Sequence, residues 1–145
     1  MINKKRLSNR IKKHEGYSRR AYLDQLGNLT IGYGHLIRNK EEFETGKKYS
    51  KKLLNKLFNK DLYITITNYN KVFSKNELPS KVEEVIIEMF FQLGLNKFLK
   101  FRKMIKALKN KNFLKASEEM RRSKWNKQDP KRVDTLAKIM KKQTP

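Results

Sequence analysis

Residues 14–36 read HEGYSRRAYLDQLGNLTIGYGHL, and their composition differs from that of the rest of the chain. Two acidic residues, Glu15 and Asp24, stand in a segment that also contains glycines, a threonine and a histidine. Elsewhere lysine, asparagine and apolar residues dominate. Because the chain carries a formal net charge of +22, the placement of these two carboxylates needs an explanation.

The pattern around Glu15 predicts a helix followed by a small sheet. Leu7, Ile11 and Glu15 are spaced as one face of a helix over about residues 4–15, and the next residue, a glycine, suits its C-terminal cap. Residues 17–37 contain two short runs rich in aromatic and β-branched residues, YSRRAYL and NLTIGYGHLI. The DQLGN between them has turn chemistry. We therefore expect a short antiparallel hairpin sheet.

The rest of the chain predicts helices. Ser50 has the chemistry of an N-cap for a long helix to about Val72. Ser80 and Glu83 form a capping box before an apolar helix that Gly94 ends. Shorter helices are expected over residues 98–109, 113–123 and 130–142, with Asn112 and Asp129 as caps of the last two and Pro130 at a first helical position.

These elements indicate an α+β fold in a single domain that covers residues 1–145. A small N-terminal lobe, about residues 14–60, would contain the short antiparallel sheet. A long helix would connect it to a helical lobe, which would comprise about residues 61–145 and the N-terminal helix over residues 4–13.

The charge balance indicates an anionic target. Lysine and arginine number 36 against 14 aspartates and glutamates, and such an excess attracts nucleic acid, anionic membrane or acidic wall polymer. Lysines scattered over solvated helix faces explain the same count, so both interpretations stay open. The chain has no cysteine and two histidines. We therefore expect no disulfide, no metal and no cofactor.

Glu15 and Asp24 have different expected environments. Glu15 continues an apolar face and lies at the negative end of a helix, and both conditions favour the protonated form that a general acid needs. Asp24 lies in a turn, where water keeps it ionised. Carboxyls driven toward different protonation states are typical of a glycosidase pair. A glutamate at a helix end and an aspartate in a turn are also ordinary structural features, so spacing alone leaves both interpretations open.

The opening segment resembles the active-site segment of the phage-type lysozymes, the endolysin muramidases. That family carries Glu, then Asp nine residues later, then Thr six residues further, within E-G-…-Y-x-D-…-T-I-G-x-G-H. Glu15, Asp24 and Thr30 match this spacing without a gap. The resemblance continues more loosely through SKKLLNKLFNKDL and EMFFQLGLNKF to SKWNKQDPKRV, and so covers most of the chain. The remaining motif positions are Gly32, Gly34 and His35.

The resemblance implies a lysozyme-like fold and a lysozyme activity. The reaction would be hydrolysis of the β-1,4 bond between N-acetylmuramic acid and N-acetylglucosamine in bacterial peptidoglycan, with lysis of the host cell. By the same resemblance Glu15 protonates the glycosidic oxygen, while Asp24 and Thr30 orient and activate a water. The family inverts the configuration at the anomeric carbon.

Three further positions are matched to substrate binding. Gln92, in F-Q-x-G, either binds substrate or only caps nearby backbone, and both readings stay open. Arg132, in W-x-x-Q-x-P-x-R-V, matches an arginine that approaches the catalytic glutamate in the family. Gly34 is the third position, where a glycine permits tight packing.

A structural ion pair is expected between His35 and Asp61. Asp61 follows Leu57 and Phe58 by one helical turn, so it lies beside a buried stripe. A half-buried aspartate needs a partner, and His35 is the candidate. Such a pair raises the pKa of the histidine.

The expected location follows from the N-terminus and the resemblance together. MINKKRLSNRIKKHEG is basic but lacks the apolar core of a signal peptide. We expect synthesis in the cytoplasm of a bacterial host and passage to the periplasmic cell wall through a holin-type pore. Self-repulsion at this charge favours a monomer.

Two other classes of protein fit the composition. One is a basic nucleic-acid-binding module with a helical core, although the chain has no zinc finger, RNP-like aromatics or base-reading basic helix, so no specific nucleic acid is expected. The other is a cationic membrane-active protein, because a lysine-rich amphipathic helix such as 98–109 can lie on anionic lipid. The latter property is compatible with an enzyme.

Overall fold

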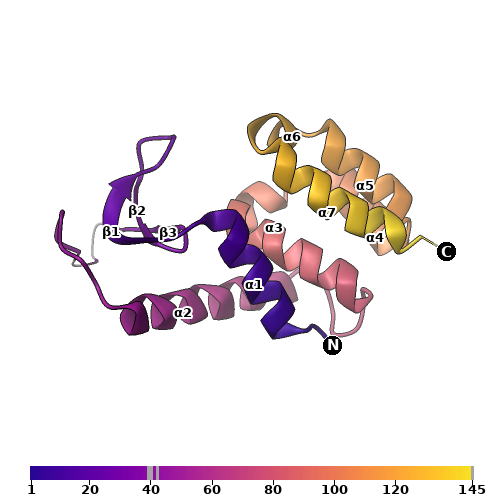
Figure 1. Cartoon of the computed structure of the whole chain (residues 1–145). Helices are drawn as coiled ribbons and strands as arrows, with labels where there is room; N and C mark the ends of the chain where they lie inside the picture. Colours follow the sequence, from indigo (N-terminus) through magenta and orange to yellow (C-terminus); the bar gives the residue numbers. More distant parts are fainter. Residues whose placement is uncertain (39–40, 42, 145) are drawn as a thin grey trace. The chain divides into compact units, whose positions relative to one another are not determined.

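The computed structural model describes residues 1–38, 41 and 43–144 and has an α+β architecture (Figure 1). Among these residues, no helix combines the length and the apolar character needed to cross a membrane. The elements, in chain order, are α1 (Lys4–Glu15), β1 (Ser18–Leu23), β2 (Leu29–Gly32), β3 (His35–Leu36), α2 (Lys51–Asn70), α3 (Ser80–Phe98), α4 (Arg102–Lys109), α5 (Phe113–Arg122), α6 (Lys124–Gln128) and α7 (Pro130–Lys142).

The chain divides into two compact units. The smaller unit is Ser8–Ile64, and the larger unit combines Met1–Leu7 with Thr65–Pro145. Both α1 and α2 contribute residues to each unit. The boundary in α1 differs from the predicted one, because residues 8–13 belong with the sheet and not with the helical part.

The sheet of the smaller unit is an antiparallel meander in the order β1-β2-β3. Tyr22 pairs with Thr30 across β1 and β2, and Ile31 pairs with His35 across β2 and β3. The predicted hairpin is therefore present, with a two-residue third strand added. The buried apolar side chains of this unit are Ile11, Ile31, Leu54, Phe58 and Leu62.

Helix α2 begins where the sequence predicted. The backbone N–H of Leu53 donates to Oγ of Ser50 at 3.1 Å, the N-cap contact expected for that serine. The segment that alternates like a strand, around Ile64, is helical, because no turn interrupts α2 before Asn70.

The larger unit is helical. Helix α3 is buried along much of its length, and at Gly94 its backbone leaves helical geometry with φ of 80°. Gly94 therefore breaks the helix as predicted, and a further short turn continues to Phe98. Helix α5 packs against α4 and α7, and α3 also packs against α7. The short helix α6 was not predicted, since its residues KWNKQ carry no apolar periodicity.

Of the other predicted caps, Asn112 is confirmed, Asp129 occupies the N-cap position without a side-chain bond, and the capping box at Ser80 is wrong. Asn112 caps α5, with its side chain accepting from the N–H of Lys115. Asp129 stands at the start of α7, yet its side chain makes no capping hydrogen bond. Ser80 is the first residue of α3 and forms no capping box, because its hydroxyl bonds elsewhere.

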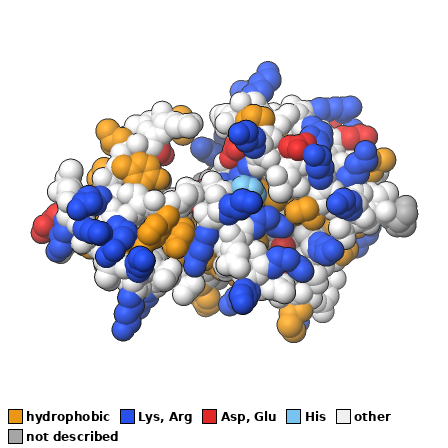
Figure 2. All heavy atoms as spheres, in the orientation of Figure 1, with side chains coloured by type: hydrophobic (Ala, Val, Ile, Leu, Met, Phe, Trp, Pro, Cys, Tyr) orange, Lys and Arg blue, Asp and Glu red, His pale blue; other side chains and the backbone are white. Residues whose placement is uncertain are grey.

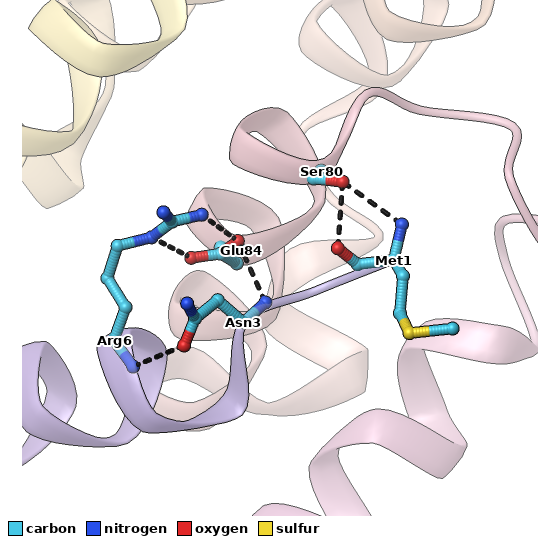
Figure 3. A network of polar contacts seen from close by, with 5 residues as sticks. All are labelled: Met1, Asn3, Arg6, Ser80 and Glu84. Atoms are coloured by element: carbon cyan, nitrogen blue, oxygen red, sulfur yellow. Dashed lines mark hydrogen bonds and ion pairs between the residues drawn. The ribbon is translucent and has the colours of Figure 1, made fainter.

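The Ser80 hydroxyl instead binds the N-terminus of the chain (Figure 3). It accepts from the terminal amino group of Met1 at 3.0 Å and donates to the carbonyl of Met1 at 2.8 Å. Nearby, the guanidinium of Arg6 donates to both carboxylate oxygens of Glu84 at 2.9 and 2.6 Å. Glu84 is buried within an apolar helix face, so this bidentate pairing compensates for the loss of water around its charge.

Candidate functional site

Glu15 is the last residue of α1 and is partly buried. Gly16, with φ of +75°, then turns the chain into the sheet. Gly34 faces the Glu15 side chain at very close range, since a β-carbon added at Gly34 would lie 2.9 Å from Oε2 and 3.1 Å from Cδ of Glu15. Only a glycine fits there without moving the carboxyl, so Gly34 forms a wall against it. This contact gives Gly34 a position beside Glu15, while its predicted role in substrate binding stays a prediction.

Asp24 is held by the turn between β1 and β2. Its Oδ1 accepts hydrogen bonds from the backbone N–H of Leu26 at 2.9 Å and of Asn28 at 2.8 Å. The backbone N–H of Asp24 donates to the carbonyl of Asn28 at 2.9 Å, and the N–H of Gly27 donates back to the Asp24 carbonyl at 3.0 Å. These four contacts fix the carboxylate within a closed turn, as the turn chemistry of DQLGN predicted.

Thr30 lies on β2 opposite Tyr22 and is only 4% exposed. Its hydroxyl donates to the carbonyl of Asn28 at 3.1 Å. Because a hydroxyl has a single proton, the Thr30 oxygen can interact with any further group there only as an acceptor.

Tyr22 is a member of this region that the sequence analysis did not select. Burial raises the pKa of its phenol, and the negative charges of Glu15 and Asp24 raise it further. The Tyr22 hydroxyl is therefore within electrostatic reach of both carboxylates, which the sequence could only propose as a pair. The signal was present as the tyrosine of Y-x-D, two residues before Asp24.

His35 makes the predicted contact with Asp61 and a second contact that was not predicted. Its Nδ1 lies 2.7 Å from Oδ2 of Asp61, and its Nε2 lies 2.7 Å from Oε2 of Glu41. Burial opposes protonation of the ring, but the two carboxylates outweigh it and raise the His35 pKa. The other Glu41 oxygen accepts from the N–H of Arg38 at 2.8 Å. The histidine thus joins β3 to α2 and to the loop between them.

Gln92 and Arg132 belong to the larger unit and have defined partners there. Oε1 of Gln92 accepts from the indole N–H of Trp125 at 2.9 Å, and its Nε2 donates to Oδ2 of Asp129 at 3.0 Å. Asp129 therefore binds Gln92 instead of capping α7. Arg132 is 2% exposed, and its Nε donates to Oε2 of Glu88 at 2.8 Å. Their predicted roles in substrate binding stay predictions.

Within the described ranges, no group of three or more His, Asp or Glu side chains is placed to hold a metal ion. The side chains of Glu15, Asp24 and Thr30 offer two carboxyls and a hydroxyl. Such groups transfer protons and orient water.

A family model and two similar proteins identify the same family. The family model described as phage lysozyme matches residues 12–143. The chain is similar to "Probable T4-type lysozyme 2" of Dictyostelium discoideum, with 31% identity over 156 aligned positions that cover 92% of each protein. It is also similar to "Probable T4-type lysozyme 1" of the same organism, with 29% identity over 153 positions that cover 90% of each.

Proposed function

This chain belongs to the phage lysozyme family, and we propose that Glu15, Asp24 and Thr30 carry out its reaction. As a member of this family it is a glycoside hydrolase, a lysozyme-type muramidase that acts on peptidoglycan. The observation that supports the assignment of the residues is geometric: Gly34 of the motif lies against the Glu15 side chain, and two backbone N–H groups of the β1–β2 turn hold Asp24 in the same unit. Two carboxyls, one as acid and one as base, are what glycoside hydrolysis requires.

Glu15 is the general acid in this proposal. It ends α1, where the partial negative charge of a helix C-terminus disfavours a carboxylate and so suits a proton donor. Because Gly34 has no side chain, the Glu15 carboxyl has room at a position that a β-carbon at residue 34 would crowd. A fixed carboxyl can deliver its proton to the glycosidic oxygen as the bond to the sugar breaks.

Asp24 is the group that activates water. The backbone N–H groups of Leu26 and Asn28 hold its Oδ1 and so fix the orientation of the carboxylate. The second oxygen, Oδ2, then takes a proton from water as the water attacks the anomeric carbon. The Thr30 hydroxyl already donates a hydrogen bond to the carbonyl of Asn28. Its oxygen therefore accepts a hydrogen bond from that water and orients it.

The configuration of the product follows from this assignment. When a base activates water on the face opposite the general acid, the anomeric configuration inverts. We expect the α-anomer to be the first product from a β-linked substrate. Proton NMR of the reducing end during early turnover distinguishes this result from retention, which would assign Asp24 as a nucleophile instead.

The primary test replaces Glu15 with Gln. We expect Glu15→Gln to fold normally and to lose about 10²- to 10⁴-fold in rate, the range for removal of a general acid. Glu44→Gln is the matched control, because it removes the same charge from an exposed position in the same unit. Release of reducing ends from purified peptidoglycan measures the rate, and circular dichroism checks the fold. Full activity in Glu15→Gln overturns the assignment.

A comparison of wild-type protein with Glu15→Gln also distinguishes hydrolysis from lysis by positive charge. Wild-type protein is expected to clear chloroform-treated Gram-negative cells, while Glu15→Gln is not. Equal clearing by both would make the net charge of +22 the lytic agent, as expected of a cationic membrane-active protein. A salt series then measures how much of the attraction to the wall is electrostatic.

A further inference from the structure

The larger unit contains a pocket built from residues other than Glu15, Asp24 and Thr30. It has a volume of about 310 Å³ and lies between the segment entering α4 and the C-terminal end of α5. These two helices pack against each other within the larger unit and are the orange segments of Figure 1. No step of the proposed reaction uses this pocket.

The lining of the pocket is strongly cationic. One acidic residue lines it, Glu119, and its carboxylate is paired with Lys115 at 3.2 Å and with Arg122 at 3.6 Å. Positive charge therefore exceeds negative charge around the pocket. The cationic lining residues are Lys100, Arg102, Lys103 and Arg122.

Cations alone are not informative in this protein, because Lys and Arg are spread over the whole face seen in Figure 2. The pocket differs because four exposed cations and a single acidic residue line the same hollow. Two of them, Arg102 and Lys103, also open α4, whose first turn contains no acidic residue.

We propose that this pocket binds phosphate groups of a polyol-phosphate polymer attached to peptidoglycan, and so retains the enzyme on its substrate. The guanidinium group of Arg102 presents paired donors that match phosphate oxygens, while Arg122 keeps its pairing with Glu119. Lys100 and Lys103 add point charges. Phe101, which also lines the pocket, offers an apolar surface to the carbon chain between phosphates. This proposal rests on the muramidase assignment for its biological setting, but its chemistry stands on the pocket alone.

The test compares two double variants that change the charge equally. Arg102→Gln/Lys103→Gln removes two cations from the pocket. Lys51→Gln/Lys52→Gln is the control, because this pair also stands in the first turn of a helix without an acidic residue there. Binding of a glycerol phosphate oligomer to the full chain is measured by calorimetry at several salt concentrations.

The pocket variant is expected to bind the oligomer about tenfold more weakly than wild type, with a salt slope lower by about 2, because two phosphate contacts are lost. The control variant is expected to stay within about twofold of wild type. Equal weakening of both variants would mean diffuse attraction and would overturn the proposal.

Two further probes identify the ligand chemistry. A polyglutamate of equal charge is expected to bind more weakly and to be insensitive to the pocket variant. Equal binding of polyglutamate with the same sensitivity overturns the phosphate assignment. A single-stranded oligonucleotide that binds more tightly through the same residues would identify nucleic acid as the ligand and would overturn the wall polymer.

The proposal and the muramidase assignment fail in different experiments. Arg102→Gln/Lys103→Gln is expected to hydrolyse phosphate-free peptidoglycan at the wild-type rate and phosphate-bearing wall more slowly at low enzyme concentration. A loss of rate on phosphate-free peptidoglycan would overturn the separation of pocket and reaction. Retention of hydrolysis by Glu15→Gln would remove Glu15 as the general acid and leave the binding result intact.

Discussion

Gly34 and the carboxyl of Glu15 are in direct contact, such that a β-carbon at position 34 would lie 2.9 Å from Oε2 and 3.3 Å from Cβ of Glu15. Real β-carbons do not approach other atoms this closely, so any larger residue at position 34 displaces the glutamate. The backbone of Gly34 also has φ of +72°, a region that glycine occupies without strain.

Gly34→Ala is therefore predicted to reduce the rate of hydrolysis by up to about 10²-fold, the cost of a displacement of about 1 Å in a reacting group. Gly46→Ala is the control. It has φ of +83° but no atom within 4 Å of the added carbon, so it carries similar backbone strain, about 1 kcal/mol, without the clash. Chemical unfolding and hydrolysis rates of both variants provide the measurement. Equal rates in the two variants would contradict a positioning role for Gly34.

The titration of Tyr22 reports on the charges of Glu15 and Asp24. Its raised pKa has burial as the first cause, with Glu15 and Asp24 adding to it. We predict that Glu15→Gln and Asp24→Asn each lower the Tyr22 pKa, because each removes one negative charge, while burial keeps the value above normal. NMR titration of tyrosines labelled at Cζ measures the change. A Tyr22 titration that is identical in wild type and Asp24→Asn would separate Asp24 from this group.

The contacts of His35 predict a pH-dependent stability. The raised His35 pKa means that its contribution is full below the ordinary value of 6.5 and is lost as pH rises through the folded value. The pKa of Glu41 is lowered by the N–H of Arg38 and by His35, against the effect of burial. Its contribution is therefore present above 4.5 and is lost as pH falls through the folded value. The joint stabilisation is expected to peak between these two ordinary values.

Asp61→Asn is the variant that tests this stabilisation. It is predicted to lower the free energy of unfolding by about 2 kcal/mol near the peak, as for loss of a charged hydrogen bond, and by less at alkaline pH. Urea unfolding at both pH values gives the measurement. Asp134→Asn is a suitable comparison, because its side chain is 45% exposed and exposed ion pairs contribute little. A pH-independent loss in Asp61→Asn would contradict a charged histidine.

The ion pair of Arg132 with Glu88 is almost completely buried, with side-chain exposures of 2% and 0%. Removing the arginine alone leaves a buried carboxylate without this guanidinium. We predict that Arg132→Met lowers the free energy of unfolding by about 3 kcal/mol, and that Glu88→Met/Arg132→Met recovers much of the loss. Arg121→Met, which breaks an exposed pair with Asp134, should cost less than about 1 kcal/mol. Equal losses in the single and double variants would contradict this account.

The sequence by itself determined the features that depend on neighbouring residues. The face shared by Leu7 and Ile11, the turn at Asp24 and the cap at Asn112 were all readable, because helix periodicity, turns and caps involve residues within a few positions of one another. The spacing of Glu15, Asp24 and Thr30 is also local, and its resemblance to the phage-type lysozymes implied the candidate reaction before the structure.

Only the tertiary structure decided the partners of polar side chains. Ser80 looked like a cap but binds Met1, and the buried Glu84 is paired with Arg6. Glu41 was not foreseen as the second partner of His35. A buried charge takes whichever complementary group the packing of distant segments brings within hydrogen-bonding distance. That choice is made by folding, and no local spacing in the chain encodes it.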